Sequence, residues 1–563
     1  MSSFFTKPIL KSLSRALGKP VDASLLEVPP GASLGDYAFP CFTLAKELKK
    51  NPVEIAKELA GKIKAGKHFD GVKAAGPYVN FFVNQEKLAE IVLTSLFREK
   101  ENYGKGKPKK RTILLEGWQP NTHKAFHIGH IRNSLVGECI SSLLEFYGYK
   151  VIRVSYIGDV GAHIAKWIWY YTSFYRGGVP SANVGVWAGQ IYSKATLKSS
   201  EKEFYKDEID AIHKRLEEGD KDLVSLWKKT RKLCLDDFKS IYKELGSKIE
   251  RWYFESEVEQ PGVVKVKGMV RKGYAKYSDD AIIFDLEKYN LGVFVLLKSN
   301  GASLYSTKDI ALAYLKSKEY RFDDSLYVVA SEQDHHFRQL FKTLELIGYK
   351  DYKKLNHVSY GMVKLKEGKM SSRLGNIILY EEFRDKLMSK VKDLLKRREI
   401  PLESKNTIVK SVAFGAMKFT MLSQDSVKEI VFDYDQALSF EGETGPYVQY
   451  THTRCASILR KSISDLRGVV DFSLLDTSGD KLLLTLLERF PRVIEEAALG
   501  YKPHLLTRYL LDLSQAFNQY YHLHPILKSD AKVMKARLCL VSSVKQVLAT
   551  GLRLLGVEAL EEM

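Results

Sequence analysis

Two histidines and a lysine lie close together in a segment whose composition suits the handling of phosphate groups. The segment, Pro120 to His130, reads PNTHKAFHIGH and stands between an apolar run and a stretch with helical periodicity. A helix N-terminus offers free N–H groups and the positive end of a dipole. Lys124, His127 and His130 add groups that stabilise charge on a transferring phosphate, and Gly129 lets a nucleotide base approach the backbone. We therefore predict a phosphate site here.

A second candidate loop lies about 240 residues further along the chain. Residues 368–376 read GKMSSRLGN, which places a lysine, two hydroxyls and an arginine between glycines. This composition suits a mobile loop that grips a pyrophosphate leaving group. A basic, serine-containing loop is by itself usually a solvated turn. The functional interpretation therefore depends on its pairing with the histidine segment.

Alternating strand and helix patterns surround both loops. A strand at Ile113 to Leu115, a helix from about His130 to Tyr147 and a strand at Val151 to Tyr156 form one βαβ series. A second series has three predicted strands and two helices, in the order Val293 to Leu297, Thr307 to Tyr320, Leu326 to Ala330, Gln333 to Tyr349 and roughly Asn356 to Val363. Two such halves predict an α/β protein with a Rossmann-like doubly wound fold. Ligands bind such sheets at the carboxyl ends of the strands.

Composition and periodicity predict three domains. Residues 1–108 are expected to form an N-terminal α/β domain that ends in a linker rich in lysine and glycine. Residues 109–400 are the predicted Rossmann-like domain, with a charged, mostly helical insertion at about 185–290. Residues 401–563 are predicted to be an all-α helical bundle, because the apolar period is helical from about residue 410 onward.

Charge and cysteine usage narrow the class of protein. The chain has 87 Lys and Arg against 68 Asp and Glu, a net charge of +19, so its surface should attract a polyanion such as nucleic acid or an acidic membrane. The five cysteines lie far apart and form no CxxC pair, which argues against a disulfide framework or a thiolate zinc site. No stretch approaches the roughly 18 apolar residues of a membrane span. We expect a protein of the cytoplasm with no membrane contact.

The two loops together resemble the signatures of class I aminoacyl-tRNA synthetases. The first matches HIGH letter for letter at His127 to His130, and the second reads KMSSR from Lys369. The resemblance implies that the two histidines stabilise the pentavalent α-phosphate of ATP while the amino-acid carboxylate attacks it, and that Lys369 holds the pyrophosphate. It also implies a set of ATP-binding residues, namely Gly129, His336, Met362, Val363, Met370 and Ser371.

Within that class the chain resembles the arginyl-tRNA synthetases. The second signature has Ser372 where lysine is usual, and Lys124 stands just before the first signature, where the family's lysine is thought to supply the missing charge. Further similar stretches are residues 116–121, 157–161, 304–311, 331–337 and 361–363. The sequence departs from the family pattern at Ala125, Ser155, Val160, His163 and Lys308.

The predicted amino-acid site follows from this resemblance and from the chemistry of arginine. A guanidinium group presents five donors in a fork and needs carboxylates or other acceptors. The resemblance places Glu116, Tyr305 and Asp309 at the guanidinium, and Asn121 and Gln333 at the α-amino group. Two simpler interpretations stay open at this point. Asp309 is also a residue favoured at a helix start, and Glu116 is also a plausible surface charge at a strand end.

Both ends of the chain extend the resemblance. Residues 33–40 and 78–83 look like the family's added N-terminal domain, which touches the elbow of the tRNA, and residues 442–450 look like its anticodon-binding domain. The expected activity is that of an arginine–tRNA ligase, which forms arginyl-adenylate and transfers arginine to the 3′-terminal ribose of tRNA(Arg). The resemblance implies ATP with Mg²⁺ as substrate, no tightly bound cofactor and no zinc or other metal site. A monomer is expected.

Three other functions compete with this interpretation. Another class I synthetase would need zinc-type Cys/His spacing for cysteine, or a cationic pocket for glutamate. An RNA-binding paralogue without catalysis would show damage at His127, His130, Lys369 or Lys124, and all four are present. Small-molecule adenylyl-transferring enzymes share the histidine loop but do not need a basic, all-α C-terminal domain.

Overall fold

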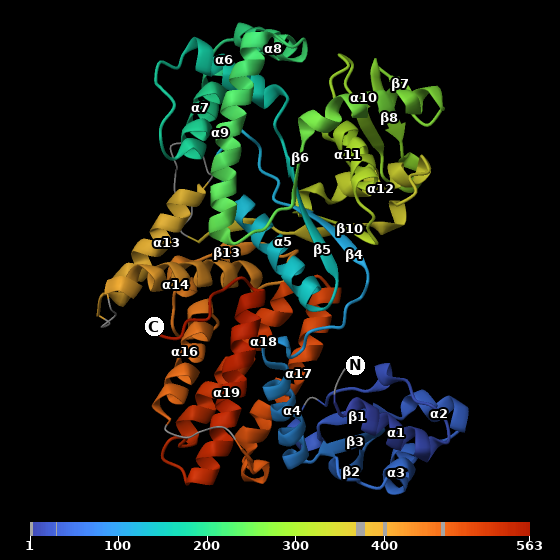
Figure 1. Cartoon of the computed structure of the whole chain (residues 1–563). Helices are drawn as coiled ribbons and strands as arrows, with labels where there is room; N and C mark the ends of the chain where they lie inside the picture. Colours follow the sequence, from blue (N-terminus) through green and yellow to red (C-terminus); the bar gives the residue numbers. More distant parts are fainter. Residues whose placement is uncertain (1–3, 30, 367–377, 398–401, 463–467) are drawn as a thin grey trace. The chain divides into compact units, whose positions relative to one another are not determined.

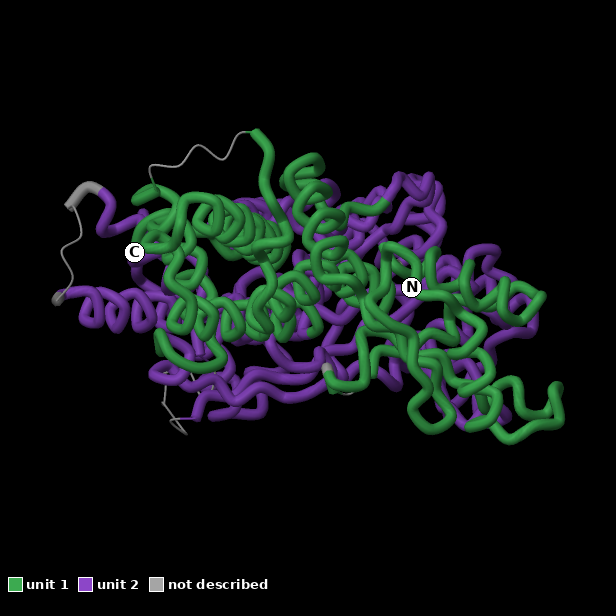
Figure 2. The backbone as a smooth tube through the Cα atoms, turned by 90° about the horizontal axis from the view of Figure 1, so that it is seen from below, with its two compact units in different colours: residues 1–106, 439–500, 505–563 green, residues 107–438, 501–504 purple. Residues whose placement is uncertain are grey.

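The structure, a computed structural model, divides the chain into two compact units. It describes residues 4–29, 31–366, 378–397, 402–462 and 468–563. Unit 1 comprises residues 1–106, 439–500 and 505–563, and unit 2 comprises residues 107–438 and 501–504 (Figure 2). Segments from both ends of the sequence therefore share unit 1, while the predicted chemistry lies in unit 2.

A five-stranded parallel sheet forms the centre of unit 2 (Figure 1). Its order is β11-β10-β4-β5-β6, and every neighbouring pair is parallel. The strands are β4 (Thr112–Gly117), β5 (Lys150–Ile157), β6 (Arg251–Phe254), β10 (Asp324–Ala330) and β11 (Leu355–Tyr360). From β4 the chain adds β5 and β6 on one side, and it later adds β10 and β11 on the other side of β4. This reversal of direction makes a topological switch point beside β4. The predicted doubly wound fold is confirmed.

Helices cover both faces of this sheet, which explains the unbroken apolar runs of its strands. Leu114 faces α10 (Glu255–Arg271) and α11 (Tyr305–Glu319) in a cluster that includes Val258 and Leu312. Leu115 faces α5 (Ile128–Phe146), where Gly137 lets the helix approach its side chain. The predicted helix after the histidine segment is thus confirmed and begins two residues earlier than expected.

The predicted insertion at 185–290 is only partly a separate helical element. Four helices, α6 (Ala162–Ser173), α7 (Val184–Ser199), α8 (Phe204–Glu217) and α9 (Lys221–Leu245), pack around buried tryptophans. The residues that follow do not belong to this cluster, because β6 is the edge strand of the main sheet. For the residues after α9, the expectation of a mostly helical surface insertion is therefore wrong. A four-residue strand is too short for its periodicity to stand out among charged neighbours.

The prediction that Val293 to Leu297 belongs to the parallel sheet is also wrong. This strand, β9 (Val293–Leu297), forms a separate antiparallel sheet with β7 (Lys276–Ser278) and β8 (Ala281–Asp285). Val293 and Val295 are exposed, whereas Phe294 and Leu296 are buried against α12 (Asp334–Leu346). This alternation is typical of a half-buried antiparallel sheet, and the exposed valines conceal it in the sequence.

The strand expected over Asn356 to Val363 is two strands. β11 ends at Tyr360, and β12 (Val363–Leu365) pairs in parallel with β13 (Ile430–Phe432). Gly361 makes the turn, and a Cβ there would lie 2.5 Å from the Lys428 carbonyl. The presence of β13 corrects the expectation that everything beyond residue 410 is helical. Three more helices complete unit 2, namely α13 (Tyr380–Leu394), α14 (Leu402–Leu422) and α15 (Tyr434–Ala437).

Unit 1 combines a small antiparallel sheet with helices from both ends of the chain. The sheet has the order β1-β3-β2, and the predicted strand Tyr78–Val83 is confirmed as β3. The remaining elements are α1 (Thr6–Leu17), β1 (Tyr37–Pro40), α2 (Phe42–Leu48), α3 (Pro52–Lys62), β2 (Phe69–Ala75), α4 (Gln85–Glu99), α16 (Gly445–Lys461), α17 (Ser478–Leu499), α18 (Pro503–Leu523) and α19 (Ala531–Leu554). The all-helical C-terminal domain is confirmed, whereas its predicted start at residue 401 stays a prediction. Across the described residues, no helix has the length and apolarity needed to cross a membrane.

A glycine fixes the spacing between the two helices that frame the carboxyl edge of the sheet. A Cβ at Gly262 of α10 would lie 2.6 Å from the Thr307 carbonyl oxygen of α11. We expect Gly262→Ala to destabilise the protein by about 1–3 kcal/mol, because the backbone of α11 must move. The measurement is the thermal unfolding midpoint of the full chain.

Gly268→Ala is the matched control on the same helix. Its Cβ would meet only the flexible end of Arg271, at 3.8 Å. Alanine has the higher helix propensity, so we expect an unchanged or slightly raised midpoint. Equal midpoints for the two variants would show that the helix crossing does not depend on Gly262.

Candidate active site

His127 and His130 cap the N-terminus of α5. The Nδ1 atom of His127 accepts from the Gly129 N–H at 3.1 Å, and the Nδ1 atom of His130 accepts from the His127 N–H at 3.2 Å. The two rings stack with centroids 3.8 Å apart. A neutral imidazole that accepts through Nδ1 must carry its proton on Nε2. Each histidine therefore presents an Nε2–H donor.

Burial keeps these imidazoles neutral. It lowers the pKa of His127 to about 4, with Lys124 adding to the effect. Burial, His127 and Lys124 together hold the pKa of His130 well below its usual range. His123 in the same loop is structural, because its ring is fully buried against Trp167 and its Nε2 lies 2.7 Å from the Thr230 hydroxyl. His127 and His130 are thus the two histidines of the segment that are available for chemistry.

Helix α7 supports the loop that carries Lys124. The Lys124 ammonium lies 5.2 Å from the centroid of the Tyr192 ring, and α7 approaches closely because a Cβ at Gly189 would lie 2.5 Å from the Ala125 Cβ. Burial lowers the pKa of Lys124, and Glu255 opposes that shift. The helical insertion, whose role the sequence did not reveal, thus helps to position the lysine beside the histidines.

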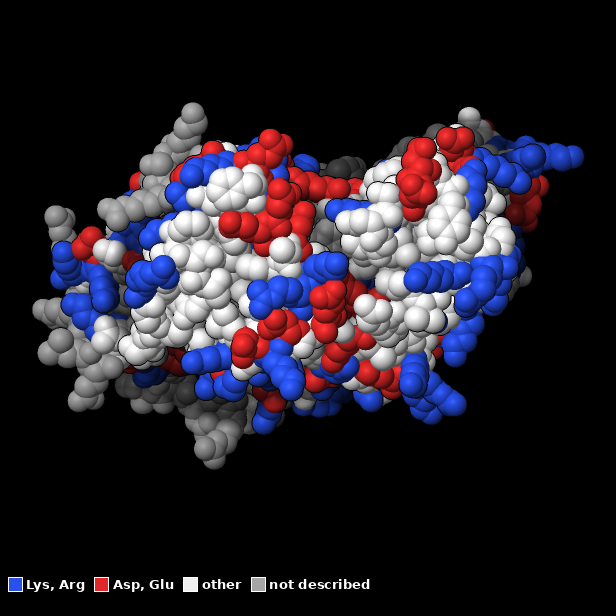
Figure 3. Space-filling view, turned by 90° about the horizontal axis from the view of Figure 1, so that it is seen from above, with Lys and Arg blue, Asp and Glu red and all other residues white. Residues whose placement is uncertain are grey.

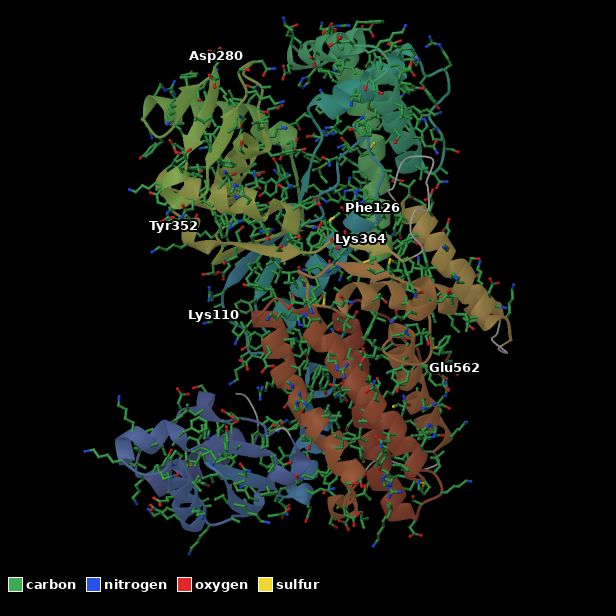
Figure 4. All side chains as sticks on the ribbon, turned by 180° about the vertical axis from the view of Figure 1, so that it is seen from behind. Lys110, Phe126, Asp280, Tyr352, Lys364 and Glu562 are labelled. Atoms are coloured by element: carbon green, nitrogen blue, oxygen red, sulfur yellow. The ribbon has the colours of Figure 1, made fainter. Side chains whose placement is uncertain are left out.

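The predicted pyrophosphate loop lies outside the described residues, including Lys369, Met370 and Ser371. Its downstream flank is bonded to the histidine segment, since the Ile128 N–H donates to the Ile378 carbonyl and the Tyr380 N–H donates to the Phe126 carbonyl, both at 3.0 Å. Its upstream flank is β12. Figure 4 labels Phe126 of the histidine segment and Lys364 of β12. The backbone therefore anchors the downstream end of that loop at the start of α5.

A buried arginine ties α5 to the strands beside that flank. The Arg132 guanidinium donates to the carbonyls of Ser426 and Lys428 at 2.8 and 2.9 Å. The Met362 carbonyl accepts from the Ile430 N–H at 2.9 Å, and Val363 begins β12. The structure thus brings the predicted nucleotide residues Met362 and Val363 to the strands that α5 holds.

Glu116 is buried, so it is not a surface charge, whereas Asp309 is half-buried in the first turns of α11, where a helix-start residue would also lie. Glu116 at the end of β4 is 2% exposed, accepts from the Gln119 amide at 2.6 Å and pairs with the buried Lys316 ammonium. Burial raises the pKa of Glu116, while Lys316 opposes the shift. Asp309 pairs with His336 at 2.7 Å. Neither carboxylate is a solvated charge.

The other predicted amino-acid residues lie at the same edge of the sheet. Asn121 pairs through its backbone with Gly158, and its Oδ1 lies 2.1 Å from the point that a Cβ at Gly158 would occupy. Tyr305 is the first residue of α11 and is 61% exposed. Gln333 is exposed at the end of β10. The close approach of the Asn121 side chain explains why the loop has a glycine at position 158.

Sequence reasoning missed two residues at the centre of this edge. Tyr156 of β5 is buried, and burial raises the pKa of its phenol well above the usual range, with four nearby carboxylates adding to the effect. Its hydroxyl has no hydrogen-bond partner among the described residues. The four carboxylates are Asp309, Glu255, Glu116 and Asp159.

Sequence reasoning did not identify Glu255, the first residue of α10, because this residue lies inside the predicted insertion. The only sequence signal is its place directly after the aromatic run Trp252 to Phe254, which is β6. Its Oε2 pairs with Lys308 at 2.7 Å, and Asp159 pairs with Arg231 of α9 at 2.7 Å. Among the described residues no group of three or more His, Cys, Asp or Glu side chains could hold a metal ion.

The doubly wound sheet and the capped histidine pair define a class I aminoacyl-tRNA synthetase. Residues 92–434 match the family described as tRNA synthetases class I (R), catalytic domain. Residues 448–563 match the DALR anticodon binding domain, and residues 4–83 match the arginyl tRNA synthetase N terminal domain.

Full-length relatives narrow the identification to the class I synthetases that act on one amino acid. The arginine–tRNA ligase of Clostridioides difficile is 38% identical over 98% of both chains, and that of Halothermothrix orenii is 38% identical over 96% of this chain and 95% of its own. The solved structure of Thermus thermophilus arginyl-tRNA synthetase matches all of both chains with a TM-score of 0.83 at 27% identity. The chain belongs to the arginyl-tRNA synthetase family, and its activity is that of an arginine–tRNA ligase.

The low pKa values of the capping histidines predict a pH effect on stability. Below about pH 6.5 the unfolded chain binds protons that folded His127 and His130 refuse, so stability should fall as the pH drops from 6.5 toward 4. Imidazole ¹⁵N shifts in histidine-labelled protein should report Nε2–H tautomers for both residues and no protonation between pH 7 and 5. Protonation of either ring near pH 6.5 would contradict the assignment.

Proposed function

We propose that His127, His130 and Lys124 assist the attack of the arginine carboxylate on the α-phosphate of ATP. The attacking oxygen forms a P–O bond as the bond to pyrophosphate breaks, and the two Nε2–H donors stabilise the oxygens that gain charge. Lys124 adds a full positive charge beside them. The observation that carries this proposal is the pair of Nδ1 bonds that aims both donors away from α5. No proton transfer is needed in this step.

The remaining predicted residues complete the nucleotide site in this proposal. Gly129 gives the base access to the backbone, and His336, Met362 and Val363 bind the nucleotide at the ends of β10 and β11. Lys369, Met370 and Ser371 hold the pyrophosphate. ATP enters as its Mg²⁺ complex. In the second step a hydroxyl of the terminal ribose attacks the adenylate carbonyl, and AMP leaves.

For arginine, we propose that Glu116, Tyr305 and Asp309 face the guanidinium group and that Asn121 and Gln333 bind the α-amino group. The burial of Glu116 and the partial burial of Asp309 support this assignment, because a desolvated carboxylate binds a fork of N–H donors strongly. Lys316 pairs with Glu116 and opposes the rise in the pKa of Glu116 that burial causes.

A cavity in unit 1 supports a place for RNA. The cavity measures about 750 Å³, and its lining includes Tyr450, Arg454, Lys461 and Tyr521. The Arg454 guanidinium lies 4.8 and 5.2 Å from the centroids of Tyr450 and Tyr521. Arginine planes and aromatic rings stack on unpaired bases. We propose that an anticodon base of tRNA(Arg) binds here, within the segment that matches the anticodon binding domain.

The surface charge agrees with local rather than uniform RNA contacts. On the face in Figure 3, basic and acidic side chains are interspersed and form no continuous basic field. We propose further that the enzyme works as a monomer in the cytoplasm. The five cysteines support a reducing compartment, because all are buried as free thiols.

Lys124→Met tests the catalytic proposal. We expect kcat for arginine-dependent exchange of pyrophosphate into ATP, measured with cognate tRNA present, to fall about 100- to 1000-fold. The KM for arginine should change little, because the lysine acts on the phosphates. Exchange by the wild type with another amino acid would overturn the arginine site itself.

Lys194→Met on α7 is the control. It removes the same charge from an exposed position on the helix that supports Lys124. Its kcat should match the wild type. A full-activity Lys124→Met enzyme would remove this residue from the mechanism.

Arg454→Ala tests the RNA proposal. We expect the KM for tRNA to rise about 10- to 100-fold, because a stacked base is worth about 1–3 kcal/mol. The KM values for ATP and arginine should not change, since the residue lies in unit 1. An exposed arginine in the same unit, Arg98, offers the control Arg98→Ala. Equal tRNA affinity for the two variants would argue against the cavity.

A further inference from the structure

We propose that Glu255 is the carboxylate that binds the α-ammonium group of the amino-acid substrate, together with Asn121. The inference rests on the proposed arginine site and adds a residue that determines how the substrate is oriented there. It assigns a substrate contact to the end of β6, a strand that sequence reasoning placed in a surface insertion.

The position of Glu255 allows this contact. Its Oε1 lies 3.5 Å from the point that a Cβ at Gly158 would occupy, and the Asn121 Oδ1 lies 2.1 Å from the same point. Two acceptor oxygens from the loops after β4 and β6 thus converge beside the loop after β5. An ammonium group has three donors and can bond to both oxygens at once.

The chemistry of the reaction places the ammonium near this point. The α-ammonium is attached to the carbon next to the attacking carboxylate, so it must lie close to the phosphate loop. Glu255 is within electrostatic reach of Lys124, whose pKa it raises against the effect of burial. The guanidinium is the far end of the substrate. Glu255 is therefore at the α-amino end.

One carboxylate oxygen of Glu255 is available to a substrate donor. Its Oε2 is held by Lys308 at 2.7 Å, which leaves Oε1 on the side of Gly158 and Asn121. A single acceptor oxygen is sufficient for one N–H of an ammonium.

The local charge balance also favours an additional cation. Lys308 serves two carboxylates, because its Nζ also lies 3.8 Å from Glu259. Burial raises the pKa of Glu255 to about 7, Lys308 opposes the shift, and Asp309 and Asp159 add to it. A substrate ammonium beside Oε1 would stabilise the ionised carboxylate that these neighbours disfavour.

Three ligands separate the ends of the substrate in the test. Arginine carries both cations, agmatine lacks only the carboxylate, and 5-guanidinopentanoate lacks only the α-amino group. Binding to the full chain is measured by calorimetry for the wild type and for Glu255→Gln. We expect the variant to bind arginine and agmatine about 10- to 100-fold more weakly, and 5-guanidinopentanoate within about twofold of the wild type.

Glu259→Gln is the matched control, because it removes the other carboxylate beside Lys308 without facing Asn121. It should bind all three ligands within about threefold of the wild type. Glu255→Asp keeps the charge beside Lys308 and withdraws the oxygens, so it should show the same selective loss if Glu255→Gln does not fold.

The outcomes are distinct. Selective loss of the two amine ligands supports the inference. Equal loss of all three, or no loss, overturns it and reduces Glu255 to the counter-ion of Lys308. Failure of the wild type to bind arginine overturns the proposed arginine site instead, before any variant is compared.

Discussion

The first N–H groups of α5 need acceptors from outside the helix, and the active site depends on how that need is met. His127 and His130 supply the acceptors through Nδ1, which places the proton of each neutral ring on Nε2. The side chains that complete the helix are therefore also the donors that we propose for the phosphate. An aspartate or serine cap would satisfy the backbone equally well and would lose the donor. The fold needs a cap here, and the proposed chemistry needs that cap to be histidine.

Burial makes this arrangement effective, and separate stretches of the chain provide the burial. Helix α7 lies against the loop at Ala125, and the segment after the lysine loop bonds to Phe126 and Ile128. Arg132 fastens α5 to the segment that leads into β13. In the proposed mechanism, a neutral imidazole in this enclosure donates to the phosphate without adding a second positive charge beside Lys124. The enclosing helices thus act on the pKa of the histidines as well as on their position.

The sequence was sufficient to predict the strands at the centre of the main sheet and the loops that follow them. Ile113 to Leu115 is apolar on both faces because helices cover both, so the run is unbroken. The sequence was not sufficient where the partner of a side chain depends on the topology of the sheet. Lys316 looks like a solvated helix charge, and only the pairing of β10 beside β4 brings the preceding helix α11 over Glu116. Glu255 was missed for the same reason, since its neighbours come from β4, β5 and α11.

The charge balance of the pocket bears on the choice of amino acid. Placing four buried or half-buried carboxylates near Tyr156 costs desolvation and mutual repulsion, which cations offset. Lys316, Arg231 and Lys308 offset part of it, and Lys308 is shared between two carboxylates. The pocket is thus short of positive charge until a substrate arrives. An amino acid with a neutral side chain brings only its ammonium, whereas arginine also brings a guanidinium. Lysine carries the same charge as arginine, so charge cannot separate these two. That distinction must come from geometry, because only a planar fork can bond to two carboxylates and a phenol in one plane.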